Sequence, residues 1–216
     1  MTEAVVFDLD GVLIASEEVW DAVRARYVGE RGGRYDAGVQ RAMMGMSSGE
    51  WSAYLHDQAG VPDEPGEINA EIVRRMLAAY RERLPLLPGA VDTVRWTAAR
   101  FPLALASSSN REIIDEVLRL AAIADCFRVT VSSEEVARGK PAPDVYLEAA
   151  RRLGVEAHRC AAVEDSHAGI RSAKTAGMRV VAIPNPSYPP DGEALAAADV
   201  AIGTLGELTV EVLAGH

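Results

Sequence analysis

The sequence predicts an α/β fold in which a Rossmann-like parallel sheet carries an inserted bundle of α-helices. Short apolar runs alternate with helical patterns along most of the chain. The runs are apolar at nearly every position, a pattern typical of strands that helices cover on both faces. The first two runs lie about 90 residues apart, far more than one crossover helix requires. That gap predicts the insert.

Each element of the predicted sheet follows from its own stretch of sequence. In chain order, the strands are predicted at 4–9, 102–107, 127–132, 160–165, 179–183 and 199–203. Amphipathic patterns predict helices at 110–120, at 144–153 before Gly154, and from Ser166 to Gly177. Parallel strands joined by right-handed crossovers share one edge for their carboxyl ends, so residues that follow different strands are expected to meet there.

The long insert shows only helical patterns. Its apolar stripes, with a spacing of four residues, are Val19, Val23 and Tyr27; Val39 and Met43; Trp51 and Leu55; and Ile68, Ile72, Met76 and Tyr80. We therefore expect an inserted helical domain at 15–84 and an α/β core domain at 1–14 and 85–216. The stripes leave open which of the larger side chains face the crevice at the sheet edge; the candidates are Trp20, Met46, Trp51 and Tyr54.

Composition narrows the class of protein. The chain has 49% hydrophobic and 25% charged residues, as soluble globular proteins do, and a formal net charge of −10. Nucleic acids and anionic membrane surfaces select basic patches, so neither is an expected partner. No apolar run approaches the roughly 20 residues of a membrane span, and no targeting segment precedes the first strand. We expect a cytoplasmic protein, either a monomer or a weak dimer.

The cysteines and histidines give no sign of a zinc site. Cys126 and Cys160 are far apart in sequence and are expected to be reduced. Three of the histidines are expected to face solvent, namely His56, His158 and His216. The fourth, His167, follows Asp165 closely and is expected to pack or hydrogen-bond near it without binding a metal.

Four carboxylates are expected at the carboxyl edge of the sheet. Asp8 and Asp10 end the first predicted strand two positions apart, so their side chains share a face, and Gly11 permits a sharp turn. Glu164 and Asp165 end another predicted strand. Carboxylates this close repel one another. A set of hard oxygen ligands without His or Cys favours Mg²⁺ as the compensating cation.

An anion site is predicted beside these acids. Ser107 and Ser108 end the second strand, ahead of a helix that Asn110 is expected to cap, and such a helix N-terminus binds anions. The four acids carry −4, Mg²⁺ reduces this to −2, and Lys140 of the loop GKPAPD reduces it to −1. A divalent cation, a lysine and serine donors that converge on one point favour a phosphate group. A free aspartate there is positioned to attack phosphorus.

The four motifs, taken in their order along the chain, resemble those of a known superfamily. Taken singly, DLDG is more often an ordinary turn, SSSN a helix cap, GKPAPD a solvated loop and ED a charged helix start. In the order DLDGVL, LASSSN, GKPAPD and VEDSHAGI, each at a predicted strand end, they resemble the haloacid dehalogenase-like superfamily. Within it the chain is most similar to the β-phosphoglucomutase-like branch, in which a helical cap follows the first strand. The resemblance covers nearly the whole chain.

The resemblance implies a role for each motif. Asp8 would be the nucleophile and a metal ligand, and Asp10 the general acid and base, with its backbone carbonyl on Mg²⁺. Glu164 and Asp165 would form the rest of the metal site. The phosphate would be held by Ser107, Lys140 and the backbone N–H groups of Leu9 and Ser108.

The predicted function is that of a Mg²⁺-dependent phosphatase that hydrolyses a small organic phosphate monoester, such as a sugar phosphate, through an aspartyl-phosphate intermediate. A phosphosugar mutase is the alternative. Members of the superfamily with that activity resemble one another in a cap histidine and a cap arginine, where this chain has Trp20 and, approximately, Ser48. Dehalogenases of the superfamily lack an acid equivalent to Asp10, which disfavours that reaction. A catalytically idle binding protein is disfavoured because every core group is present.

Two large side chains near the predicted site have two interpretations each. Trp20 either forms an apolar wall of the substrate site or packs inside the bundle beside Val23. Arg111, next to the SSSN motif, either lies on a helix surface or binds a second anionic group of the substrate.

Overall fold

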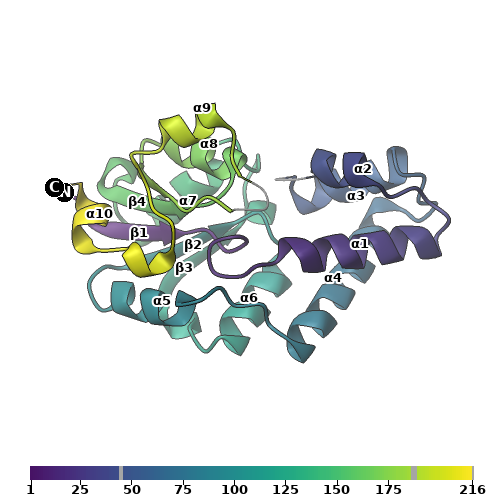
Figure 1. Cartoon of the computed structure of the whole chain (residues 1–216), viewed down its shortest axis with the longest axis horizontal. Coiled ribbons are helices and arrows are strands. Elements are labelled where there is room, and N and C mark those ends of the chain that lie inside the picture. Colours follow the sequence, from purple (N-terminus) through teal and green to yellow (C-terminus); the bar gives the residue numbers. More distant parts are fainter. Residues whose placement is uncertain (44–45, 186–188, 216) are drawn as a thin grey trace.

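The computed structural model of the chain describes residues 1–43, 46–185 and 189–215. One six-stranded sheet lies at its centre, and every pair of neighbouring strands is parallel, so the predicted α/β class is confirmed (Figure 1). The strand order is β3-β2-β1-β4-β5-β6. The strands are β1 (Ala4–Phe7), β2 (Leu103–Ser107), β3 (Phe127–Ser132), β4 (Cys160–Glu164), β5 (Arg179–Ala182) and β6 (Val200–Ala201).

Helices cover both faces of this sheet (Figure 1). On one face lie α5 (Ala90–Ala98), α6 (Arg111–Leu120) and α10 (Val210–Ala214), and on the other α7 (Asp144–Leu153) and α8 (His167–Thr175), with α9 (Gly192–Ala197) against α8. Short 3₁₀ turns complete this part of the chain: η1 (Ala124–Cys126), η2 (Ser133–Glu135), η3 (Ala157–Arg159) and η4 (Leu205–Glu207).

The apolar runs form strands because both of their faces are buried. Every residue of β1, β2 and β4 is buried. Along β1 the side chains alternate between two cores: Val5 and Phe7 pack with α5 and α6, and Ala4 and Val6 pack with α7 and α8. The strands agree with the predicted runs to within two residues at each end.

The insert between β1 and β2 begins with four helices, here termed the helical group. They are α1 (Glu17–Glu30), α2 (Ala37–Met43), α3 (Ser48–Asp57) and α4 (Pro65–Glu82). Figure 1 places the helical group beside the sheet, at the end opposite the chain termini. Most of the predicted stripe residues are buried between its helices, and Val19 and Val23 are half-buried. The periodicity of four thus marked the faces that pack together.

Two adjacent connections join the helical group to the sheet. A bridge pairs Ile14 with Leu86, the Ala15 N–H donates to the Pro85 carbonyl at 2.8 Å, and the Leu87 N–H donates to the Leu13 carbonyl at 3.0 Å. The chain therefore leaves the sheet and returns to it at one place. Among the described helices, none combines the length and the apolar character needed to cross a membrane.

Candidate functional site

The carboxyl ends of three neighbouring strands meet at one cavity. Its volume is about 300 Å³, and it lies between the sheet edge and the helical group. Asp8 follows β1 directly, Ser107 is the last residue of β2, and Glu164 is the last residue of β4. The central position of β1, between β2 and β4, brings these residues together.

The first strand ends earlier than predicted. β1 stops at Phe7, so Asp8 and Asp10 belong to the following turn, where Gly11 has φ of +78°. Both aspartates nevertheless line the cavity. The turn, not the pleat of a strand, gives them a common direction. Gly11 is needed there because a Cβ at this position would lie 1.9 Å from Asp165 Oδ2.

Three of the four predicted carboxylates form a buried cluster. One oxygen from each of Asp8, Glu164 and Asp165 lies within 4.8 Å of the others. Asp10 lies outside this cluster, and its carboxylate accepts hydrogen bonds from Ser109 Oγ at 2.7 Å and Ser107 Oγ at 3.4 Å. Asp10 therefore lines the cavity beside this three-acid cluster, with its side chain turned toward the serine hydroxyls.

Lys140 contacts two of the three acids of the cluster. Its Nζ donates to Asp8 Oδ1 at 2.7 Å, to Glu164 Oε1 at 2.6 Å and to the Ala106 carbonyl at 3.1 Å. The lysine is 7% exposed, so these contacts take place away from water. Burial opposes its positive charge, but Asp8 and Glu164 outweigh burial and raise the pKa of Lys140. The lysine is a cation that offsets one of the acids.

Glu164 is the acid that Lys140 offsets. Burial alone would raise the pKa of Glu164, yet Lys140 and the Ser166 N–H together hold it below its ordinary value. Its Oε1 also accepts from Tyr146 Oη at 2.8 Å, and its Oε2 accepts from Asp165 N, Ser166 N and Ser166 Oγ at 2.9, 3.1 and 3.1 Å. Since a carboxylate has about four lone-pair sites, direct metal ligation by Glu164 requires that one of these donors leave.

Lys140 offsets the other two acids only in part. Burial raises the pKa of Asp8 to about 8, although Lys140 opposes the shift. Burial, with the nearby Glu164 and Asp8, raises the pKa of Asp165 well above its ordinary value. Within the described residues, no hydrogen bond reaches Asp8 Oδ2 or the Asp165 side chain. Hard oxygen donors whose charge is incompletely compensated are what a small divalent cation binds, so the residues fit such an ion.

Gly169 fixes the position of Glu164, which leads to a prediction. A Cβ on Gly169 would lie 1.7 Å from Glu164 Oε1. We expect Gly169→Ala to push the Glu164 carboxylate away from Lys140 and to lower the free energy of unfolding by about 2–3 kcal/mol, as measured by urea denaturation. Gly66→Ala in α4 is the matched control, since nothing lies within 4 Å of that Cβ position. Equal stability of the two variants would contradict this packing argument.

The loop after β2 differs in detail from the prediction. Ser107 is fully buried, and its Oγ accepts from the Ser109 N–H at 3.0 Å. Ser108 lines the cavity as expected. Ser109, which was not predicted as a site residue, makes the shortest contact with Asp10. A run of three serines gave no signal as to which hydroxyl would face the acid, because that depends on the turn.

Asn110 precedes α6 as predicted, but its side chain does not cap the helix. Instead, Asn110 Nδ2 donates to Asn69 Oδ1 at 3.1 Å and to Glu134 Oε1 at 2.8 Å. Glu134 also accepts from the Arg111 N–H at 3.0 Å and, across the cavity border, from Ser48 Oγ of α3 at 2.8 Å. Glu134, which was not predicted, thus joins the helical group to the loop after β2.

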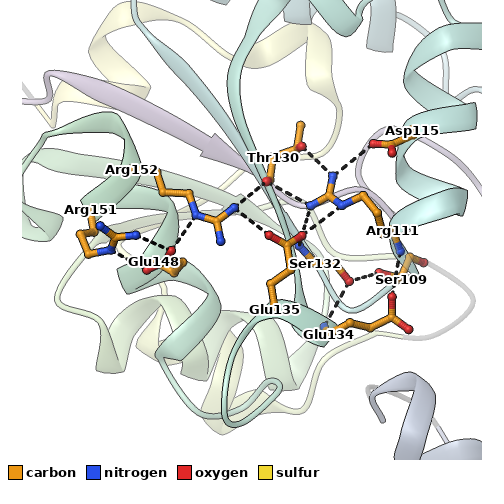
Figure 2. Close-up of polar contacts among 10 residues, drawn as sticks. All are labelled: Ser109, Arg111, Asp115, Thr130, Ser132, Glu134, Glu135, Glu148, Arg151 and Arg152. Atoms are coloured by element: carbon orange, nitrogen blue, oxygen red, sulfur yellow. Dashed lines mark hydrogen bonds and ion pairs between the residues drawn. The ribbon is translucent and has the colours of Figure 1, made fainter.

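Arg111 lies outside the site. Figure 2 shows its guanidinium among Thr130, Asp115 and Glu135, and it donates to Thr130 Oγ1 at 2.7 Å and to Asp115 Oδ1 at 3.2 Å. Arg152 binds the same Glu135 at 2.7 Å (Figure 2). This surface network satisfies Arg111, so of its two interpretations the helix-surface one holds.

The predictions for the four histidines differ in their outcomes. His56 is half-buried, with its Nδ1 3.0 Å from the Asp63 carbonyl, so the expectation that it faces solvent was wrong. His158 is exposed. His167 lines the cavity, pairs with Asp191 at 2.7 Å and lies outside the acidic cluster. His216 lies outside the described residues. Pro189 and Pro190 also line the cavity.

The helical group supplies the far wall of the cavity. Of the four large side chains left open by the sequence, Trp20, Met46 and Trp51 line it and Tyr54 does not. Trp20 also donates from Nε1 to Asp10 Oδ1 at 3.4 Å, so it is a wall residue and not merely part of the bundle core. Arg24, which was not predicted, lines the cavity as well. In the sequence, Arg24 could have been found from its spacing of four residues from Trp20, because residues four apart lie side by side on a helix.

Comparisons with known proteins agree with this geometry. A family model described as haloacid dehalogenase-like hydrolase matches residues 2–177. Hexitol phosphatase B of Escherichia coli is 31% identical over 98% of this chain and 96% of its own length. A bifunctional riboflavin kinase/FMN phosphatase of Arabidopsis thaliana is 32% identical over 98% of this chain, which spans 55% of that protein. The crystal structure of CbbY from Rhodobacter sphaeroides in complex with phosphate has a TM-score of 0.87 and 28% identity, covering 99% of this chain and 100% of that one.

Proposed function

The chain belongs to the haloacid dehalogenase-like hydrolases, and from this membership we propose that it hydrolyses a small organic phosphate monoester, such as a sugar phosphate. The observation that carries the proposal is a cavity lined by two buried acids whose charge is incompletely compensated, Asp8 and Asp165, together with Lys140. A phosphate ester is an anion, and it can approach Asp8 only where cations offset these acids. The hexitol phosphatase relative supports a phosphorylated sugar as the substrate class.

We propose Mg²⁺ as the cofactor, with Asp8 and Asp165 as its side-chain ligands and the Asp10 carbonyl and Glu164 as the further groups that the family resemblance implies. The donor set consists of oxygens alone, which suits Mg²⁺. When bound, the ion supplies the positive charge that lets a phosphate enter an acidic cavity.

The chain's own residues then divide the reaction into two steps. A carboxylate oxygen of Asp8 attacks phosphorus, and the bond from phosphorus to the alcohol oxygen breaks. Asp10 gives its proton to the departing alcohol, then takes a proton from the water that opens the aspartyl phosphate. Ser109 and Trp20 hold the Asp10 carboxylate at the cavity wall by the hydrogen bonds described above.

We also propose that residues 15–84 act as a cap over the site. The contact of Trp20 with Asp10 and that of Ser48 with Glu134 are formed only when the helical group lies against the sheet edge. Closure would exclude water while the phosphoryl group is transferred to Asp8.

Phosphosugar mutase activity is the second candidate and is less well supported. The position at which the resemblance places a phosphate-holding arginine is Ser48, and its hydroxyl donates to Glu134. Trp20, at the position of the cap histidine, contributes an indole N–H and not an imidazole.

The test of the proposed function is a screen of phosphate esters with Mg²⁺, in which free phosphate and isomerised sugar are both measured. Release of phosphate from sugar phosphates is the expected result. Isomerisation without release of phosphate would favour the mutase. Absence of any Mg²⁺-dependent turnover, aryl phosphates included, would refute both.

Mg²⁺ affinity is expected to fall as pH is lowered through about 8, the pKa to which burial raises Asp8. Below that pH the metal-free carboxyl holds a proton, and Mg²⁺ must displace it, so the apparent Kd should rise by up to about tenfold per pH unit for each proton released. Calorimetric titration in two buffers of different ionisation enthalpy measures both the affinity and the protons released. An affinity that does not change between pH 6 and 9, with no proton release, would contradict the assignment of Asp8 as a ligand.

A further inference from the structure

Arg24 of α1 contacts two indole rings on the cavity wall. Its guanidinium carbon lies 4.6 Å from the ring centroid of Trp20 and 4.8 Å from that of Trp51. The two rings are themselves in an edge contact, with centroids 6.0 Å apart and planes at 61°. Cation–π contacts of this kind stabilise the charge but provide no hydrogen-bond acceptor. The N–H groups at the rim of the guanidinium therefore need partners from elsewhere.

Those partners are missing among the described residues. Arg24 Nε is fully buried and has no hydrogen-bond partner. Nor does any described carboxylate form an ion pair with Arg24. Asp21, a neighbour on α1, accepts instead from Tyr35 Oη at 2.9 Å. A buried donor left without an acceptor costs about 1–3 kcal/mol, and more when the group is charged.

The charge of Arg24 is likewise poorly compensated. Burial lowers the pKa of Arg24 to about 10, and Tyr35, Asp10 and Asp21 only partly offset this. The side chain still carries its charge at neutral pH. Among the described residues that line the cavity, the only other lysine or arginine is Lys140, which is bound to Asp8 and Glu164. An anion in the outer part of the cavity would find Arg24 as its one available cation there.

We propose that Arg24 is a specificity-determining residue that binds a second anionic group, a carboxylate or a phosphate, on the part of the substrate distant from the reacting phosphoryl group. The proposal rests on the proposed phosphatase function. A planar guanidinium offers paired N–H groups, an arrangement that suits the paired oxygens of such an anion. A neutral hydroxyl would satisfy one donor but would leave the charge uncompensated.

The test uses pairs of substrates that differ only at the distal group. One pair is a hexitol monophosphate and the corresponding aldonic acid monophosphate, and the other is a hexose monophosphate and the corresponding bisphosphate. The variants are Arg24→Met, which keeps the packing between the indoles without the charge, and Arg24→Lys, which keeps the charge without the planar group. Arg26→Met is the matched control on the same helix, since the Arg26 side chain is 80% exposed.

The wild-type enzyme is expected to prefer the anionic member of at least one pair, and the pair that shows the preference identifies carboxylate or phosphate as the group. Arg24→Met should lower kcat/KM for that member by about 10- to 100-fold, mainly through KM, and change the neutral member by less than about threefold. Arg24→Lys should restore part of the loss, and Arg26→Met should have no effect. An equal loss on both members, or no preference in the wild type, would overturn the proposal.

Failure of the proposed function is distinguishable from failure of this inference. If no substrate releases phosphate, the same pairs are titrated into the wild-type chain and into Arg24→Met by calorimetry with Mg²⁺ present. Tighter binding of the anionic member that disappears in Arg24→Met would support the role of Arg24 while refuting the phosphatase. Binding that is the same in both chains would refute the role of Arg24.

Discussion

Replacement of Asp8 by Asn is expected to lower kcat by about 10⁴-fold or more and to leave the chain folded. The amide offers no anionic oxygen to attack phosphorus, and it removes one carboxylate from the proposed Mg²⁺ site. Both losses act on the same step, so residual activity should be close to that of the reaction without enzyme.

The fold should survive because the ionised Asp8 side chain opposes folding. Burial raises its pKa from 3.8 to about 8. A carboxyl that binds its proton more tightly in the folded chain lowers the free energy of unfolding as pH rises from about 4 to about 8. Asn removes this penalty, and its amide oxygen can still accept from Lys140. We therefore expect the metal-free variant at about pH 8 to unfold at the temperature of the wild type or above it.

Steady-state hydrolysis and thermal unfolding, measured on the same preparation, check both parts. Asp125→Asn is the matched control, because Asp125 is exposed in η1 and away from the cavity. A variant of Asp8 that keeps a tenth of the wild-type activity would show that another group attacks phosphorus. A loss of activity that accompanies unfolding would leave the nucleophile to be established by trapping the aspartyl phosphate in the wild type.

The sheet was predictable because its signal is local and strong. Strands buried on both faces must be apolar at nearly every position, and the segments 103–107 and 160–164 meet that condition without help from the rest of the chain. Once the strands are parallel, topology alone brings Asp8, Ser107 and Glu164 to one edge. This part of the site required no knowledge of side-chain direction.

The site residues that were not predicted from the sequence are those whose role depends on side-chain direction. Which serine hydroxyl reaches Asp10 is decided by the turn after β2, and three consecutive serines carry no information on it. Glu134 resembles any acid at the start of a 3₁₀ turn until Ser48, 86 positions away, is brought against it. Arg24 is an ordinary polar residue of a helix until two tryptophans, one of them from another helix, contact its guanidinium.

The second large effect is expected on stability. Lys140→Met should lower the free energy of unfolding by about 3–5 kcal/mol near neutral pH, because it leaves Asp8 and Glu164 buried without their cation. Methionine has a similar length and fills the same space, so packing is largely preserved. Lys174→Met is the matched control: Lys174, the chain's other lysine, pairs with Asp199 on the surface at 2.9 Å, and its loss should cost less than about 1 kcal/mol.

The pH dependence of this deficit separates a charge effect from a packing effect. Asp8 and Glu164 outweigh burial and raise the pKa of Lys140 above 10.5, so the lysine's own contribution is fully present below that pH and constant between pH 5 and 8. In Lys140→Met the pKa of Glu164, now without its cation, should rise, and both acids should bind protons on acidification. The deficit measured by urea denaturation should therefore be smaller at pH 5 than at pH 8. A deficit of the same size at both pH values would mean that Lys140 stabilises the fold by filling space and that the proposed charge balance of the site is wrong.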